Sequence, residues 1–136
     1  MPAQPPPDDV RYLDLADYLY LAGAALDVAP EALFDVADLG LAESALHAPA
    51  ATFAGVEFYP DLVTKARVLL VHLAKNHPLP DGNKRAAYLA MIEFLARNGR
   101  RFLAADVDAT IDMMVKIAGS EVDQAEVEDW IRRQTE

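Results

Sequence analysis

The chain has 136 residues, 53% of them hydrophobic and 25% charged, so it is long enough for one sizeable core and too short for two. The absence of cysteine excludes disulfides, zinc–thiolate sites and thiol catalysis, and the formal net charge of −10 argues against a general nucleic-acid-binding protein. No apolar run is long enough to cross a bilayer and no basic–apolar leader opens the chain, so we expect a cytoplasmic protein without membrane contact.

Helical patterns dominate the chain, and we expect a single all-α domain over residues 9–136. Residues 1–8 are rich in proline and have almost nothing to bury, which is typical of a disordered leader. Apolar residues then recur at helical spacing, which predicts a first helix over residues 9–28.

The next segment combines helix signals with one extended stretch. Pro30 followed by Glu31 is typical of a helix start, so one or two short helices should run from there to His47. Residues 52–59 carry β-branched and aromatic side chains around Gly55, which predicts a short hairpin or an extended flap.

Two helices in the middle of the chain are apolar on most sides. The first covers residues 62–73, and the second covers residues 83–98 and should end at Gly99. Helices that are apolar nearly all round are buried ones, so this pair should form the centre of the fold.

The last third of the chain should contain one extended segment and two helices. Residues 101–103 are expected to be extended, and Asp106 should cap the helix that follows. Asp123 and Glu126 have the spacing of a capping box, which predicts a last amphipathic helix with Trp130 on its buried face.

The charge is unevenly distributed along this acidic chain. Residues 60–101 carry eight basic and three acidic side chains, a net charge of +5, whereas the other residues carry four basic and nineteen acidic ones, a net charge of −15. A single cationic segment in an acidic protein favours an anionic ligand. Chance clustering of charges on solvated helix faces explains the distribution equally well at this point.

Residues 77–85, with the sequence HPLPDGNKR, connect the two central helices and end in the first turn of the second. A helix start exposes free backbone N–H groups and the positive end of the helix dipole, so acidic residues are favoured there. Lys84 and Arg85 instead add two cations, an arrangement that an anion would complete. Gly82 would let a ligand approach the backbone, and a phosphate chain suits the fork of Arg85 and the point charge of Lys84.

Two other side chains of this segment have chemistry that suits phosphate handling. Asp81 offers a carboxylate oxygen, the ligand type that holds Mg²⁺ together with substrate phosphates, and His77 offers an imidazole that can take up a proton near neutral pH. Each residue also has a structural explanation: Asp81 as a helix N-cap, His77 as the end of the preceding helix, Lys84 and Arg85 as solvated charges. The functional interpretation depends on finding all of them within nine residues.

The segment HPLPDGNKR closely resembles the signature motif of the Fic/Doc family. TFAGVEFYPDL before it and RAAYLAMIEFLARNG after it resemble the Doc (death-on-curing) branch, and the resemblance extends over residues 12–133. It implies a compact all-α bundle around the helix that bears the motif, with a short flap. It also implies a transferase that uses ATP and Mg²⁺ to modify a target protein.

The resemblance implies a role for each residue of the motif. His77 would be the general base that deprotonates a hydroxyl of the target, and Asp81 would hold Mg²⁺. The remaining motif residues would bind the phosphates: Gly82, Asn83, Lys84 and Arg85. Lys84 and Arg85 would also take part in catalysis. The family's flap, which aligns the target by strand addition, would include Thr52, Phe53, Gly55, Glu57 and Tyr59.

Lys84 distinguishes the two branches that the motif resembles. Adenylyl-transferring Fic enzymes usually have glycine at this position, whereas Doc-like toxins have lysine and transfer the γ-phosphoryl group of ATP to elongation factor Tu, which stops translation. Lys84 therefore favours the Doc-type kinase. A Fic-type adenylyltransferase (AMPylation) and a catalytically degenerate binding module remain the alternatives.

Two departures from the family pattern affect the expectations. Leu79 stands where phenylalanine is usual and keeps the apolar character of a core anchor. The chain lacks the (S/T)xxxE(G/N) pattern that inhibits some Fic proteins, so self-inhibition is not expected. The resemblance then implies restraint by a separate Phd-like antitoxin whose C-terminal segment folds onto the toxin's groove.

Overall fold

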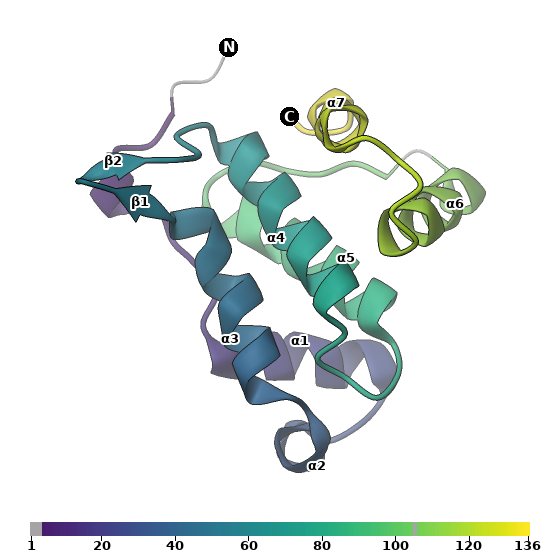
Figure 1. Ribbon diagram of the computed structural model, residues 1–136. Coiled ribbons are helices and arrows are strands. Elements are labelled where there is room, and N and C mark those ends of the chain that lie inside the picture. The colour runs from purple at the N-terminus through teal and green to yellow at the C-terminus, as the bar shows by residue number, and fades with distance from the viewer. Residues whose placement is uncertain (1–3, 105) are drawn as a thin grey trace.

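Two helices, α4 (Leu62–Asn76) and α5 (Asn83–Arg97), pack side by side at the centre of the fold (Figure 1). The computed structural model describes residues 4–104 and 106–136. Ten of the 15 residues of α4 are buried, as are seven of the 15 of α5. The prediction that these two apolar helices form the core is therefore confirmed.

In the described part of the chain, five further α-helices surround the central pair. On one side α1 (Leu15–Leu26) packs against α5, α3 (Leu39–His47) packs against α4, and the short α2 (Pro30–Val36) lies beside α1. On the other side lie α6 (Val107–Ala118) and α7 (Gln124–Arg133), which both contact α4 (Figure 1). The expected all-α class is confirmed, because the regular strands in the described residues are limited to one short hairpin.

The hairpin lies where the sequence predicted a flap. Its strands, β1 (Thr52–Phe53) and β2 (Val56–Glu57), are antiparallel, with Thr52 opposite Glu57 and Phe53 opposite Val56. The turn residues Ala54 and Gly55 have φ angles of 52° and 80°, the left-handed region that two-residue hairpin turns favour. The hairpin projects from the bundle between α3 and α4 (Figure 1).

Aspartate side chains begin most of the helices. Asp14 and Asp17 form a reciprocal capping box at the start of α1, with each carboxylate accepting the other's backbone N–H at 2.8 and 3.0 Å. The helix predicted from residue 9 therefore begins only at Leu15. At α7, the side chain of Asp123 accepts the backbone N–H of Ala125. The second half of the predicted capping box, a bond from the Asp123 backbone N–H to the Glu126 carboxylate, is not among the contacts of the described residues.

The described part of the proline-rich leader contacts the domain, which differs from the disorder expected for residues 1–8. Oε1 of Gln4 accepts the backbone N–H of Leu62 at 2.7 Å, and its Nε2 donates to Asp61 at 3.3 Å. A glutamine amide can satisfy both kinds of group, so it supplements the cap of α4. Met1–Ala3 lie outside the described residues.

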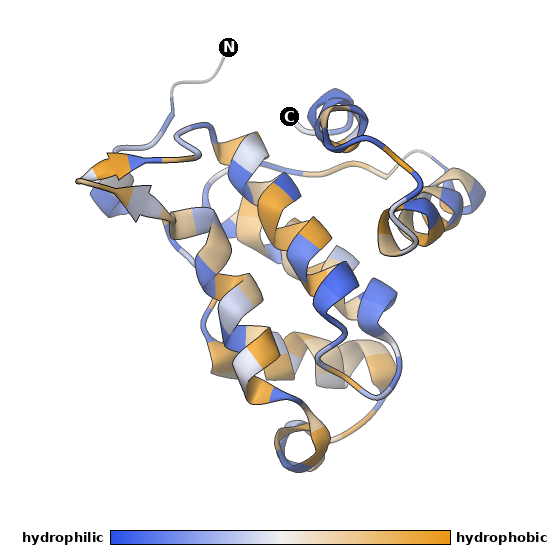
Figure 2. Ribbon diagram, in the orientation of Figure 1, coloured by the Kyte–Doolittle hydropathy of each residue, from blue (hydrophilic) through white to orange (hydrophobic). Residues whose placement is uncertain are grey.

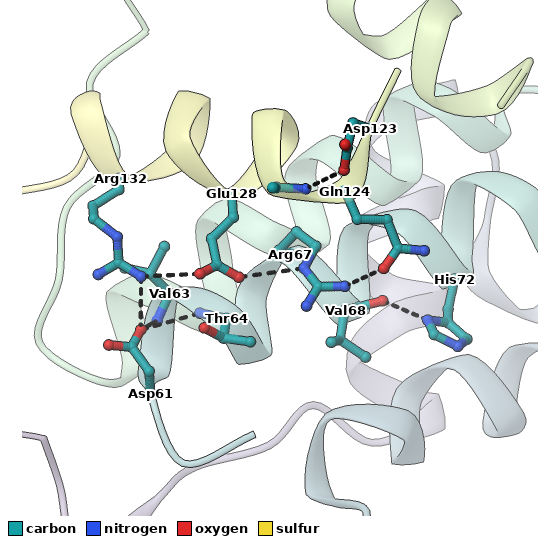
Figure 3. Close-up of polar contacts among 11 residues, drawn as sticks. Asp61, Val63, Thr64, Arg67, Val68, His72, Asp123, Gln124, Glu128 and Arg132 are labelled. Atoms are coloured by element: carbon teal, nitrogen blue, oxygen red, sulfur yellow. Dashed lines mark hydrogen bonds and ion pairs between the residues drawn. The ribbon is translucent and has the colours of Figure 1, made fainter. Parts of the chain in front are cut away.

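Side-chain pairs join α7 to α4 (Figure 3). Arg132 pairs with Asp61 and Glu128, each at 3.2 Å, and Arg67 donates to Gln124 at 2.6 Å and to Glu128 at 3.4 Å. The Arg132–Glu128 pair lies within α7. The other contacts link residues 57 to 71 positions apart and hold the C-terminal helix against the centre.

The chain also returns on itself near its C-terminus. The backbone N–H of Leu103 donates to the carbonyl of Gln134 at 2.7 Å, and Phe102 pairs with Thr135 in an isolated antiparallel bridge. The extended segment predicted at residues 101–103 is thereby confirmed.

Hydropathy follows the packing. The bodies of α4 and α5 carry much of the hydrophobic colour in Figure 2, whereas the first turn of α5 is hydrophilic. None of the helices in the described ranges is long and apolar enough to cross a membrane.

Candidate active site

The loop of residues 77–82 connects α4 to α5 and carries the first part of the motif. His77 ends α4 with φ 52° and ψ 55°, a left-handed conformation that few non-glycine residues adopt. The structural role considered for His77, closing the preceding helix, is therefore correct and coexists with an exposed imidazole. Leu79 is buried, so leucine fills the apolar anchor position.

Asn83 holds this loop through its side chain. Its Oδ1 accepts the backbone N–H of Leu79 at 2.9 Å, and its Nδ2 donates to the carbonyl of Leu79 at 2.9 Å. These two backbone groups fix the orientation of the amide, and Nδ2 also lies 3.3 Å from Nδ1 of His77. The hydrogen-bond pattern therefore assigns the lone pair of the neutral imidazole to Nδ1 and its proton to Nε2. Because the side chain of Asn83 is engaged in these contacts, only its backbone N–H can make the phosphate contact predicted for this residue.

The start of α5 lacks the carboxylate cap that α1, α3, α4, α6 and α7 each have. Its N-cap is Gly82, with φ 80° and no side-chain hydrogen bond. Asp81 is exposed and does not cap the helix, so the N-cap interpretation of this residue was wrong. The N–H groups of the first turn are therefore open to a ligand.

Two cations stand beside these open N–H groups. Lys84 and Arg85 are exposed; within the described ranges Lys84 makes no ion pair or hydrogen bond, and Arg85 makes one hydrogen bond, from Nη1 to the carbonyl of Ala25 at 3.3 Å. The chain has 22 acidic residues, yet none of those described pairs with either cation. Uncompensated positive charge thus gathers at the positive end of a helix dipole.

A pocket of about 510 Å³ opens at this helix start, between α5 and α6. Motif residues form its polar wall: Asp81, Gly82, Lys84 and Arg85. Residues of α5, of the following segment and of α6 form its largely apolar wall: Tyr88, Ala104, Val107, Thr110, Ile111 and Met114. A volume of this size is in the range of small-molecule sites, and the division into a cationic and an apolar wall suits a ligand with an anionic and an aromatic part.

Tyr88 supplies the aromatic ring of that apolar wall. Burial raises the pKa of its phenol, although a hydrogen bond with Thr110 acts in the opposite direction. The phenol is therefore neutral at physiological pH and offers a ring face and a hydroxyl rather than a charge.

The structure brings most of the predicted residues together. Asp81, Gly82, Lys84 and Arg85 line one pocket, whereas His77 does not line it and is linked to this helix start through Asn83. No group of three or more acidic or histidine side chains within the described residues could hold a metal ion by itself. A single carboxylate such as Asp81 fits a Mg²⁺ ion that takes its other ligands from phosphates and water.

The flap residues divide into exposed and engaged ones. Thr52, Phe53 and Gly55 are exposed, as docking residues should be. Glu57 instead turns inward, where Nζ of Lys65 donates to its Oε1 at 2.7 Å. Tyr59 is half-buried beneath the guanidinium of Arg67, which lies 5.9 Å from its ring centroid.

Sequence reasoning missed the apolar wall of the pocket. Tyr88 follows Lys84 by four positions and Arg85 by three, so helical spacing alone could have placed it on their face. Val107, Ile111 and Met114 also have helical spacing, but nothing in their spacing tells which helix they face.

Comparison with known proteins agrees with this geometry. The model of the Fic/DOC family matches residues 12–95, which include the hairpin, α4, the motif loop and most of α5. The chain is also 42% identical over 114 residues to a protein named Toxin Doc from Mycolicibacterium smegmatis (strain ATCC 700084 / mc(2)155), an alignment that covers 83% of this chain and 85% of the relative. Together with the motif at the start of α5, these similarities establish that the chain belongs to the Fic/DOC family.

Proposed function

We propose that this chain is the toxin of a toxin–antitoxin pair and that it transfers the γ-phosphoryl group of ATP, with Mg²⁺, to a hydroxyl of a target protein. The observation that carries the proposal is the start of α5, where open N–H groups, Lys84 and Arg85 border a pocket of about 510 Å³. That site suits a phosphate chain at its cationic wall and a nucleoside at its apolar wall. The similarity to a protein named Toxin Doc supports the toxin assignment.

The proposed reaction is a direct displacement at the γ-phosphorus. The target hydroxyl oxygen forms a bond to that phosphorus, the bond to the β–γ bridging oxygen breaks, and ADP leaves with its electron pair. The hydroxyl proton passes to Nδ1 of His77, the nitrogen whose lone pair is free of a proton in the tautomer assigned above. For this step the hydroxyl replaces the Asn83 amide, whose contact with Nδ1 is 3.3 Å long.

The cations of the first turn would stabilise the phosphates during transfer. Arg85 can bind two oxygens at once through its planar fork. Lys84 adds a point charge, and it can turn to the phosphates without breaking an ion pair, since it has none among the described residues. Mg²⁺, held by Asp81 and phosphate oxygens, would neutralise charge on the phosphate chain.

Lys84 favours phosphoryl transfer over adenylyl transfer. Its side chain lines the pocket at the position where adenylyl-transferring relatives of the motif usually have glycine. By resemblance, the target would be elongation factor Tu, and a Phd-like antitoxin would restrain the activity. The test uses ATP labelled at the γ or the α position with purified elongation factor Tu. We expect the γ label on the target; transfer of the α label alone would replace the kinase assignment by adenylyl transfer.

A variant at position 84 tests the reason for this assignment. Lys84→Gly should impair transfer of the γ label, because it removes a cation from the phosphate wall. Unchanged transfer in this variant would contradict the role given to Lys84.

A growth assay tests whether the protein is a toxin that needs its imidazole. Induced expression of the natural chain should stop growth, and His77→Ala should abolish this effect. His47→Ala is the matched control, because His47 is an exposed histidine at the end of α3, away from the motif. Equal toxicity of the natural chain and His77→Ala would argue against His77 as the base, and absence of toxicity in all three would favour a binding module.

A further inference from the structure

Lys65 is a buried charged residue on the helix that precedes the motif. Its side chain is 1% exposed, and it lies on α4 close to the hairpin. Lysine is almost never fully buried unless it is paired, because removing an ammonium group from water is costly. The partners of Lys65 therefore indicate what its burial achieves.

The segment that leads into the flap and the last residue of β2 meet at this one ammonium group. Nζ of Lys65 donates to the carbonyl of Pro49, three residues before β1, at 3.3 Å, and to Oε1 of Glu57, the last residue of β2, at 2.7 Å. Tyr12 completes the site, with its ring centroid 5.7 Å from Nζ. We call Lys65, the Pro49 carbonyl and Glu57 the flap anchor.

The flap anchor draws one side chain of the hairpin inward and leaves an apolar pair on the opposite face. Side chains of a strand alternate between faces, and the register places Thr52 opposite Glu57 and Phe53 opposite Val56. Glu57 is held inward, at 18% side-chain exposure, whereas Phe53 and Val56 on the other face point to solvent and are 73% and 68% exposed. Thr52, across from Glu57, is exposed as well. A shift by one residue would exchange these two sets.

From this geometry we propose that Lys65 is a positioning residue for target binding: it orders the flap before the target arrives and presents Phe53 and Val56 to it. The inference rests on the proposed function in treating the flap as the target-docking element. A pre-ordered edge loses less conformational freedom when a strand of the target adds to it, so binding is stronger. The exposed apolar pair suits a target segment with apolar side chains beside the modified hydroxyl.

The variant Lys65→Met tests the anchor directly. Methionine keeps an unbranched apolar stem in the buried site, and Glu57, partly exposed already, can turn to solvent. Lys75→Met is the matched control, because it makes the same chemical change at an exposed position of the same helix. A second variant, Lys65→Met with Glu57→Gln, removes both charges and so excludes an effect of an unpaired carboxylate.

Hydrogen exchange of the flap amides is the first measurement. The N–H of Phe58, which donates to the carbonyl of Ala51 at 3.0 Å, reports on the base of the hairpin. We expect its exchange to be about tenfold faster in both Lys65 variants than in Lys75→Met, because the loss of one charge-assisted hydrogen bond changes an opening equilibrium by about that factor. The protection of amides in α5 should be unchanged. Equal flap exchange in Lys65→Met and Lys75→Met would overturn the proposal.

Steady-state kinetics is the second measurement and separates positioning from general stability. In Lys65→Met the KM for the target protein should rise by about tenfold while the KM for ATP is unchanged, because the anchor contacts the flap and not the pocket. A rise in both KM values, or in neither, would overturn the positioning role. If the natural chain transfers no phosphoryl group but the exchange difference is present, the proposed function fails and the flap anchor stands.

Discussion

Replacing Asn83 with alanine removes the contacts that hold the motif loop. The side chain makes two hydrogen bonds to the backbone of Leu79 and one to His77, and both Asn83 and Leu79 are buried. A buried N–H or C=O that loses its partner costs about 1–3 kcal/mol, so with two such groups we expect unfolding to become easier by about 2–6 kcal/mol. That is a large share of the roughly 5–15 kcal/mol that stabilises a typical domain.

Asn98 provides a matched control at the other end of the same helix. Its Oδ1 accepts the N–H of Arg11 at 2.9 Å and its Nδ2 donates to the carbonyl of Arg11 at 2.9 Å, the same two-point contact with a backbone; Nδ2 also donates to the carbonyl of Phe94 at 2.8 Å. Arg11 is exposed, and water can replace the lost amide there. We therefore expect a smaller loss for Asn98→Ala, about 1–2 kcal/mol.

Urea unfolding at neutral pH and the rate of γ-phosphoryl transfer together test this reasoning. Asn83→Ala should lower the rate by about 10- to 100-fold at a temperature where it is fully folded, because a loosened loop misplaces His77. Asn98→Ala should leave the rate unchanged. The reasoning is refuted if Asn83→Ala unfolds at the same urea concentration as the natural chain, or if the two variants transfer phosphate equally fast.

Three further substitutions test other parts of the structure. Gly82→Ala should destabilise the chain by about 2–3 kcal/mol, because φ is 80° and an added Cβ would clash with the side chain of Leu26. Gly99→Ala, with φ 79° and open space around it, should show only the backbone part of this loss in thermal unfolding. Burial raises the pKa of Asp61, but hydrogen bonds and the ion pair with α7 outweigh it and leave the pKa below its usual value. The stabilisation by this carboxylate is thus complete above about pH 4 and is lost as pH falls through the lowered pKa. The difference in unfolding free energy between the natural chain and Asp61→Asn should therefore shrink on acidification, and a difference that grows would contradict the assignment. Ala54→Asn should slow hydrogen exchange in the hairpin, because asparagine tolerates φ 52° better than alanine; faster exchange would argue against the turn geometry.

Local patterns in the sequence were sufficient for most of the framework. Periodicity identified α4 and α5 as buried helices, and the combination of β-branched and aromatic residues around Gly55 located the hairpin. These predictions succeed because the hydrophobic period of an element depends on residues within one or two turns of each other. The start of α1 was missed for a local reason as well, since the Asp14–Asp17 box was not recognised.

The motif loop shows where local information ends. Its nine residues predicted an anion site at a helix start, which stays a prediction, and the structure places four of them on the wall of one pocket. The inward turn of Asn83, however, depends on where the Leu79 backbone folds back, and the apolar wall depends on α6 coming to lie beside α5.

By itself, the sequence determined the all-helical class, the two central helices and the position of the family motif, because each is encoded by neighbours along the chain. Only the tertiary structure decided that Lys65 is buried against Pro49 and Glu57 on either side of the hairpin, that Glu57 faces inward, and that Arg132 reaches Asp61. The physical reason is that a charge is buried only where distant segments supply its partners, and no spacing within the chain specifies which segments meet.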